Sequence, residues 1–305
     1  MKIAFLNKYQ EKVNRGAETF VQEVSSRLKK NHQVEVISNI NYFNLLKNKY
    51  DLIIPTNGRL QVVLVRLITW LRKEKMLVSG QSGIGFDDRL NLYCFPDIFV
   101  ALSDFACRWA KKVNPFVSVI KIPNGVDPKV FKPEKVNHNQ KTVLAVGAFT
   151  KEKRHDLTIS AVAGLKDVKL IIAGSRGPLK SETEALGRKL LADRLEILSV
   201  SHQKMPEVYR RASAFCYPTV PWESFGIAMV EAMASDLPVV ANNDPIRREI
   251  VGEAGLLVNP VDIKAYTAAL AKALKTDWGS KPRHQAEKFN WDTIAEKYEN
   301  ILKSF

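Results

Sequence analysis

Short apolar runs rich in Val, Ile and Leu alternate with longer segments of helical periodicity along almost the whole chain. Runs of strand length predict strands at residues 2–7, 33–38, 51–56, 75–79, 97–102, 117–122, 142–147, 168–173, 195–199, 214–218, 238–241 and 255–258. Continuous apolar runs are typical of parallel strands that are buried on both faces and covered by helices. The pattern therefore predicts an α/β fold built on parallel sheets.

Between these runs, apolar residues recur at helical spacing. This periodicity predicts helices that include 17–30, 60–72, 104–112, 157–165, 182–191, 206–211, 227–235 and 263–274. The last segment, 282–305, has the same character, with Trp291, Ile294 and Tyr298 on one helical stripe. We expect this terminal segment to cross back to the first part of the chain.

Twelve strands are too many for one comfortable sheet, so the chain is predicted to divide into two domains. Residues 123–140 combine several prolines and a glycine with a polar stretch, and the linker is placed there. The predicted divisions are 1–125, 126–281 and the terminal helix 282–305. Ligands of doubly wound sheets bind at the carboxyl ends of the strands. We therefore expect two Rossmann-like halves that face a central cleft.

Composition narrows the function classes. The chain has 305 residues, of which 46% are hydrophobic and 26% charged, as in ordinary globular proteins. No apolar run is long enough to span a membrane, and the three scattered cysteines favour a reducing, cytoplasmic setting. The formal net charge is +14, and residues 1–125 alone hold 19 Lys and Arg against 10 Asp and Glu. Such a surface attracts anionic small molecules, anionic lipid or nucleic acid.

Two of the classes suggested by fold or charge lack their usual motifs. Zinc-finger spacing and a basic helical tract are absent, which argues against a non-enzymatic nucleic-acid binder. The first strand is not followed by G-x-G-x-x-G, which argues against a dinucleotide oxidoreductase.

The predicted helix 59–72 carries basic residues at intervals of seven, Arg59, Arg66 and Lys73, on an otherwise very apolar sequence. Helices that lie on membrane surfaces look like this. A helix that covers a sheet and has one solvent-exposed edge looks the same. Both interpretations stay open, and the basic first domain favours peripheral contact with anionic membrane at its cytoplasmic face.

The strongest local signal is the segment Pro221-Trp222-Glu223-Ser224-Phe225-Gly226-Ile227, which runs into a helix that contains Glu231. A helix that begins near residues 225–226 presents backbone amides and a partial positive charge, which suits a phosphate group. Carboxylates on either side of that turn can accept hydrogen bonds from sugar hydroxyls. The alternative is that Glu223 is a helix-terminal charge and Glu231 a solvated surface residue.

The spacing of these two glutamates resembles the E-x7-E signature of retaining glycosyltransferases of family four, which have the GT-B fold. Further segments match that family's pattern in order along the chain. These are Gly16-Ala17-Glu18, Ile122-Pro123-Asn124-Gly125-Val126-Asp127, Ala145-Val146-Gly147 with Lys153 to Leu157, Val200 to Pro206 with Tyr209, and Phe289-Asn290-Trp291.

The resemblance implies roles for individual residues. Glu223 and Lys153 would be catalytic: the first binds hydroxyls of the donor sugar, and the second neutralises the leaving diphosphate. Glu231 would bind the ribose, His202 would line the base pocket, and Gly16 would let the first-domain loop approach the phosphates. The distal phosphate would be seated by Ser224, Phe225, Gly226 and Ile227.

Several positions depart from the family pattern. Ala148 stands where an arginine is usual, and Arg154 stands where a glycine usually follows the lysine; Arg154 is a candidate to compensate. Arg15 replaces the first glycine of the usual pair, where an arginine could point at phosphate or equally face solvent. Gln81 occupies the place where a histidine often lies near the acceptor, and glutamine cannot act as a general base. Arg15 and Gln81 are therefore the acceptor-side candidates.

The resemblance implies a retaining, hexosyltransferase-like enzyme that moves a sugar from a nucleotide diphosphate sugar to a glycan or lipid-linked acceptor of the cell envelope. No Asp-x-Asp occurs and Asp87-Asp88 is the only acidic pair of interest, so no metal and no cofactor are expected. Another GT-B enzyme, an epimerase or a phosphorylase, is the alternative.

Overall fold

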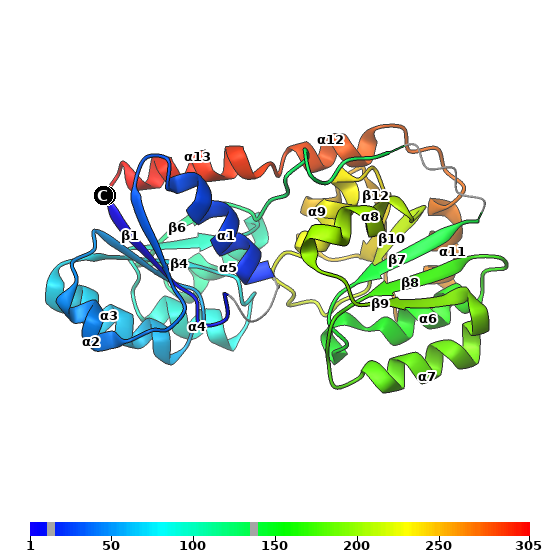
Figure 1. The fold of residues 1–305 in the computed structure, drawn as a ribbon, viewed down its shortest axis with the longest axis horizontal. Helices are drawn as coiled ribbons and strands as arrows, with labels where there is room; N and C mark the ends of the chain where they lie inside the picture. Colours follow the sequence, from blue (N-terminus) through cyan, green and yellow to red (C-terminus); the bar gives the residue numbers. More distant parts are fainter. Residues whose placement is uncertain (11–15, 135–139) are drawn as a thin grey trace. The chain divides into compact units, whose positions relative to one another are not determined.

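The computed structural model describes residues 1–10, 16–134 and 140–305, which form two compact units (Figure 1). Unit 1 comprises Met1–Gly125, Trp222–Phe225 and Trp291–Phe305, and unit 2 comprises Val126–Pro221 and Gly226–Asn290. Each unit is built on a six-stranded sheet in which every pair of neighbouring strands is parallel. The predicted α/β class with two parallel sheets is confirmed. Among the described residues, no helix is long and apolar enough to cross a membrane.

The sheet of unit 1 has the strand order β2-β1-β3-β4-β5-β6. Its strands are β1 (Lys2–Leu6), β2 (Gln33–Ile37), β3 (Leu52–Pro55), β4 (Lys75–Ser79), β5 (Ile98–Ala101) and β6 (Ser118–Lys121). Apolar side chains of one sheet face, such as Ala4 and Leu6, form a core with Val62, Val65 and other residues of the covering helices. Those helices are α2 (Tyr42–Lys47), α3 (Leu60–Arg72), α4 (Phe86–Tyr93) and α5 (Asp104–Val113).

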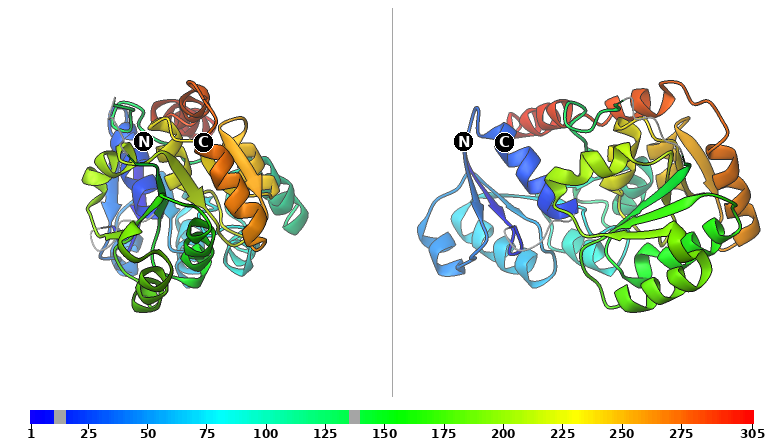
Figure 2. Two further views of the ribbon diagram at one scale, coloured as in Figure 1. Left: turned by 90° about the vertical axis from the view of Figure 1, so that its right-hand side faces the viewer. Right: turned by 45° about the vertical axis from the view of Figure 1, so that its right-hand side comes forward.

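The opposite face of this sheet is covered by α1 (Gly16–Leu28) and α13 (Trp291–Leu302), which run side by side (Figure 1 and Figure 2). The ring of Phe20 packs on Phe5 from the sheet and on Tyr298 from α13, with centroids 6.4 and 5.7 Å apart. Arg27 Nε donates to Asp292 Oδ1 at 2.7 Å. The C-terminal helix is therefore an integral layer of unit 1.

The terminal segment 282–305 is two helices rather than one. Helix α12 (Lys281–Glu287) packs against α9 (Ile227–Ala234) in unit 2, whereas α13 belongs to unit 1. Between them, Asn290 forms a β-bridge with Val126, and the amide of Val126 donates to the carbonyl of Phe289 at 2.8 Å. Backbone pairing thus interrupts the helix, and the segment assigned to unit 1 begins at Trp291 instead of residue 282.

The sheet of unit 2 has the order β12-β11-β10-β7-β8-β9. Its strands are β7 (Thr142–Val146), β8 (Lys169–Ala173), β9 (Leu195–Leu198), β10 (Ala214–Tyr217), β11 (Val239–Asn242) and β12 (Gly255–Val258). One face forms a core with α6 (His155–Ala163), α7 (Lys180–Leu191) and α11 (Ile263–Ala273). The remaining helices of this unit include α8 (Met205–Arg210), α9, α10 (Pro245–Val251) and α12.

All twelve predicted strands are present, but α2, α4 and α10 were not predicted. Each is only six to eight residues long, so its periodicity is weak. Helix α10 is defined by its cap: Asp244 Oδ1 accepts from the amides of Ile246 and Arg247, and Pro245 occupies the first turn.

In both sheets the strand order reverses beside the first strand of the unit, between β1 and β3 in unit 1 and between β7 and β10 in unit 2. Such reversals are where ligands of open α/β sheets bind, outside the carboxyl ends of the strands. They direct the search for a functional site to the loops after β1, β3, β7 and β10.

Candidate functional site

In unit 2, the loops that follow β7 and β10 meet at the reversal. Strand β7 leads through Gly147 into the 3-10 turn η1 (Lys151–Lys153), and the neighbouring strand β10 ends at Tyr217. Lys153 Nζ donates to Tyr217 Oη at 2.9 Å and lies 5.1 Å from the centroid of the same ring. Tyr217 is buried, so the ammonium group is held at a fixed place in the site.

A glycine is required beside this lysine. Gly147 has φ +155°, and a Cβ there would lie 3.0 Å from Lys153 Cγ. Any side chain would therefore displace the stem of Lys153. Sequence analysis selected Lys153, but it did not reveal that the backbone at Gly147 packs against the side chain of this lysine.

The N-terminus of α9 also lies against Tyr217. Gly226 precedes the helix with φ +91°, and a Cβ on it would approach Tyr217 Cε1 to 2.8 Å. The helix then begins at Ile227, with its partial positive charge at this end. A lysine ammonium and a helix N-terminus thus converge on one buried tyrosine, and this arrangement favours an anionic group such as a phosphate.

Glu231 lies one turn further along α9 and is only 5% exposed. Its Oε2 accepts from Tyr209 Oη at 2.7 Å, and its Oε1 is 2.9 Å from His202 Nε2. Burial, and then the adjacent carboxylate, raises the pKa of Tyr209 well above its ordinary value, so this phenol stays a hydrogen-bond donor. The interpretation of Glu231 as a solvated surface residue is wrong, because its carboxylate is oriented by two ring side chains.

The loop of residues 219–221, which leads into Glu223, is held by two side chains that sequence analysis did not select. Asn242 brackets Thr219: its Oδ1 accepts from the Thr219 amide at 2.9 Å, and its Nδ2 donates to the Thr219 carbonyl at 2.7 Å. Arg247 is fully buried and donates through Nη2 to the carbonyls of Val220 and Pro221, both at 3.2 Å. Its Nε donates to Asp244 Oδ2 at 2.8 Å.

Arg154 occupies the left-handed region at φ +48°, between η1 and α6. This conformation favours glycine, the residue that the family pattern has at this place. His155 follows, buried, with Nε2 3.3 Å from the Gly147 carbonyl and its ring 5.3 Å from that of Phe149. Burial lowers the pKa of His155 and favours its neutral form, consistent with a role in holding the η1 turn.

Gly16 and Gln81 belong to unit 1. Gly16 is the first residue of α1 and is exposed, whereas Arg15 lies outside the described residues. Gln81 Nε2 donates to Ser79 Oγ at 2.9 Å and to Asn124 Oδ1 at 3.0 Å, while its Oε1 accepts from Asn124 Nδ2 at 2.8 Å. Both ends of its amide therefore brace the β4 loop against the Pro-Asn-Gly segment.

Unit 1 also contains the segment Trp222–Phe225. Glu223 and Ser224 are half-buried and Phe225 is buried. This segment lies against the loop after β4, because a Cβ on Gly83 would come within 2.2 Å of the Trp222 carbonyl oxygen. The structure thus groups the candidates in two sets, one with Lys153 and Glu231 in unit 2 and one with Glu223 and Gln81 in unit 1.

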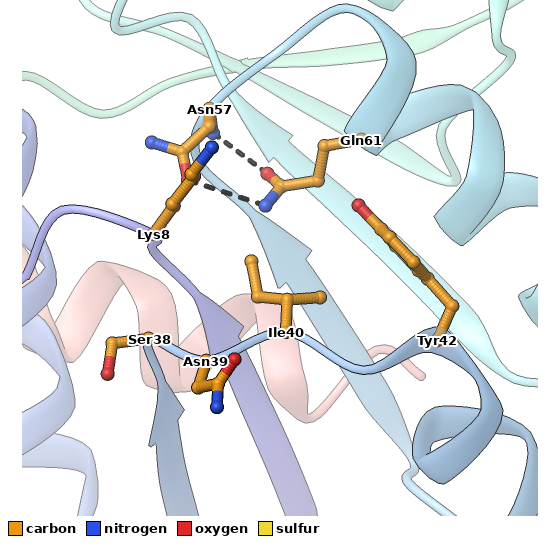
Figure 3. A pocket seen from close by; sticks show the side chains of 7 residues that line it. All are labelled: Lys8, Ser38, Asn39, Ile40, Tyr42, Asn57 and Gln61. Atoms are coloured by element: carbon orange, nitrogen blue, oxygen red, sulfur yellow. Dashed lines mark hydrogen bonds between the residues drawn. The ribbon is translucent and has the colours of Figure 1, made fainter.

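A pocket of about 680 Å³ opens at the strand-order reversal of unit 1 (Figure 3). It is lined by Lys8, Ser38, Asn39, Ile40, Tyr42, Asn57 and Gln61, which follow β1, β2 and β3 or begin α2 and α3. Asn57 and Gln61 are linked by two hydrogen bonds, from the Asn57 amide to Gln61 Oε1 at 2.9 Å and from Gln61 Nε2 to Asn57 Oδ1 at 3.4 Å. Its wall of amides and hydroxyls suits a polyhydroxylated ligand.

The acidic pair Asp87-Asp88 is not arranged as a cation site. Asp87 Oδ1 accepts from Arg59 Nε at 2.8 Å, and Asp88 is buried with its Oδ1 3.0 Å from Asn91 Nδ2. Burial raises the pKa of Asp88 to about 7. In the described parts of the chain, no group of three or more His, Cys, Asp or Glu side chains is placed to hold a metal ion.

The chain is similar to a known protein family and to curated glycosyltransferases. The family described as Glycosyl transferases group 1 matches residues 126–293. A phosphatidyl-myo-inositol mannosyltransferase from Mycobacterium leprae is 30% identical over 226 residues, which are 67% of this chain and 59% of the relative. An O-antigen chain mannosyltransferase B from Escherichia coli is 30% identical over 155 residues, 49% of this chain and 38% of the relative. The chain therefore matches only part of the length of these curated relatives, 59% of the first and 38% of the second.

Solved structures agree on the fold. Alr3699/HepE from Anabaena, crystallised with UDP and glucose, superposes with a TM-score of 0.87 over the whole of both chains at 18% identity. Sucrose-phosphate synthase from Thermosynechococcus elongatus superposes with a TM-score of 0.83 over 100% of this chain and 98% of that one, also at 18% identity. Two parallel six-stranded units with these matches make the chain a member of the glycosyl transferases group 1 family, with the GT-B fold.

Proposed function

We propose that the protein transfers a hexosyl group from a nucleotide diphosphate sugar to a hydroxyl of a glycan or lipid-linked acceptor. The observation that carries this proposal is the convergence of Lys153 and the N-terminus of α9 on Tyr217 at the strand-order reversal of unit 2. A departing nucleoside diphosphate gains negative charge as the glycosidic bond breaks, and fixed positive groups stabilise that charge.

The contacts of Glu231 within unit 2 and the family pattern around Glu223 support further donor-side roles. Glu231, oriented by Tyr209 and His202, offers carboxylate oxygens to the ribose hydroxyls of the donor. Glu223, at the end of the loop held by Asn242 and Arg247, binds hydroxyls of the transferred sugar. The positive groups at Tyr217 serve the diphosphate in place of a metal ion, so transfer proceeds without one.

We further propose that transfer retains the anomeric configuration and that the pocket of unit 1 receives the acceptor. The amides of Asn57 and Gln61 and the hydroxyl of Tyr42 suit a polyol, and Lys8 suits an anionic group attached to it. The mannosyltransferase relatives favour mannose as the first sugar to test, and the UDP-bound structure favours including UDP-sugars.

The test is donor turnover by wild type, Glu223→Ala and Lys153→Ala over a panel of UDP-, GDP- and ADP-sugars, with product configuration read by NMR. We expect retained configuration, no effect of EDTA, and loss of at least about 100-fold in turnover for both variants, as when a stabiliser of transition-state charge is removed. Circular dichroism checks that each variant is folded. Unchanged turnover in both folded variants would refute the assignment, and turnover that requires inorganic phosphate would indicate a phosphorylase.

A further inference from the structure

Helix α3 has two apolar faces. Its inner stripe, Val62, Val65 and Ile68, packs into the core of unit 1. On its outer side, Leu60, Leu67, Trp70 and Leu71 are 68, 56, 58 and 76% exposed. A helix that only covers a sheet needs one apolar face, so the second stripe requires a different explanation.

The exposed residues form one continuous stripe. Leu60, Leu67 and Leu71 are spaced by seven and four residues, and Trp70 lies three after Leu67, so all four project from the same side of the helix. Isolated exposed apolar residues are ordinary on protein surfaces, but these four share one side of a helix and are not isolated.

Two neighbouring helices each expose a phenylalanine as well. Helix α2 packs against α3 and exposes Phe43, whereas α4 is tied to the start of α3 by the Arg59–Asp87 ion pair and exposes Phe86. Figure 1 shows α2, α3 and α4 on the side of the unit 1 sheet opposite α1 and α13. The six residues Phe43, Leu60, Leu67, Trp70, Leu71 and Phe86 are called the outer face of α2–α4 below.

Exposed basic residues follow these apolar residues along the same helices. Lys47 and Lys49 follow Phe43 at the end of α2, Lys73 follows Leu71 at the end of α3, and Arg89 lies one turn after Phe86. All four are exposed. Exposed aromatic and leucine side chains flanked by Lys and Arg are the pattern of surfaces that insert into the interface of an anionic bilayer.

We propose that the outer face of α2–α4 docks on an anionic lipid bilayer. The apolar stripe enters the boundary between headgroups and acyl chains, and the basic residues contact the anionic headgroups. A second copy of the chain is the less suitable occupant, because a two-fold interface here would bring these basic residues against their own copies. The proposal does not depend on sugar transfer, since docking needs neither donor nor acceptor.

The experiment is co-sedimentation of the full chain with vesicles of phosphatidylcholine alone or mixed with phosphatidylglycerol, at low and high salt. The test variant combines Leu67→Ser, Trp70→Ser and Leu71→Ser. Its control combines Leu190→Ser and Val261→Ser, two exposed apolar residues of unit 2. Two charge-reversal variants separate attraction by anionic headgroups from apolar insertion: Lys73→Glu is the test, and Lys264→Glu in unit 2 is its control. Circular dichroism and sedimentation velocity report folding and self-association.

Wild type is expected to bind vesicles with phosphatidylglycerol at least about tenfold better than phosphatidylcholine alone, and salt should weaken that binding. The triple variant should lose at least about tenfold on both vesicles, and Lys73→Glu should lose binding only to the anionic ones. The unit 2 variants should bind like wild type. Absence of wild-type binding at low salt, a triple variant that binds like wild type, or self-association that the triple variant abolishes without any vesicle binding would each overturn the proposal.

Discussion

Arg247 is the most sharply testable residue of the donor side. Its guanidinium is fully buried, ion-paired with Asp244 at 2.8 Å, and hydrogen-bonded to the carbonyls of Val220 and Pro221. Substitution by Met preserves most of the buried stem but removes the charge and these donors. Breaking a buried pair costs about 3–5 kcal/mol. Because Asp244 keeps its bonds to the amides of Ile246 and Arg247, we expect the low end, about 3 kcal/mol.

The neighbouring arginine supplies the control. Arg248 is exposed and donates to Asn243 Oδ1, so Arg248→Met should change stability by less than about 0.5 kcal/mol. Urea unfolding, with hydrogen exchange of α10 amides to localise the effect, measures both variants. Arg247→Met should also weaken donor turnover by at least about tenfold, since the loop that leads to Glu223 loses its anchor. Equal, small losses of stability in the two variants would refute the buried-pair reasoning.

Three further changes test separate parts of the account. Tyr217→Phe removes the acceptor of Lys153, and should lower the free energy of unfolding by about 1.5 kcal/mol and weaken diphosphate binding several-fold in calorimetry; unchanged values would show that the bond at 2.9 Å contributes nothing. Arg154→Gly relieves a left-handed residue, and should raise the free energy of unfolding by about 0.5–1 kcal/mol, whereas Arg154→Ala, which keeps the strain, should not. Burial holds the pKa of Asp88 at about 7 in the folded chain against 3.8 unfolded, so the folded state binds the extra proton and stability should fall as pH rises from about 4 to 7. Denaturation across that range should show a decline, at most about 4 kcal/mol, that Asp88→Asn flattens; equal slopes would contradict this cause.

The strands could be predicted, and the two glutamates could be selected as candidates, because each signal is local in the sequence. Continuous runs of about five Val, Ile and Leu residues predict buried parallel strands. The E-x7-E spacing identifies Glu223 and Glu231 directly, because both residues are part of the motif. The short helices were not predicted, because a capping residue such as Asp244 marks such a helix more clearly than apolar periodicity does.

What the sequence could not reveal depends on neighbours distant along the chain. Tyr217 looks like an ordinary strand residue until Lys153 and Gly226 are brought against it. In the sequence Arg247 looks like a surface residue, because arginine is rarely buried unless it has partners, and the sequence does not show those partners. Helix α3 is apolar at nine of its 13 positions, so its sequence does not say which residues face the sheet and which face outward.

The central claim is that Lys153 and the start of α9 seat the diphosphate of a nucleotide sugar. Its most direct test is calorimetric titration of wild type, Lys153→Ala and Lys151→Ala with UDP, GDP and ADP. Lys151 lies in the same turn, is exposed and carries the same charge, so it controls for net charge alone. We predict that wild type binds one of the three, that Lys151→Ala binds it equally, and that Lys153→Ala binds it at least about tenfold more weakly. Equal affinity of the two variants, or no binding of any nucleoside diphosphate by wild type, would contradict the account.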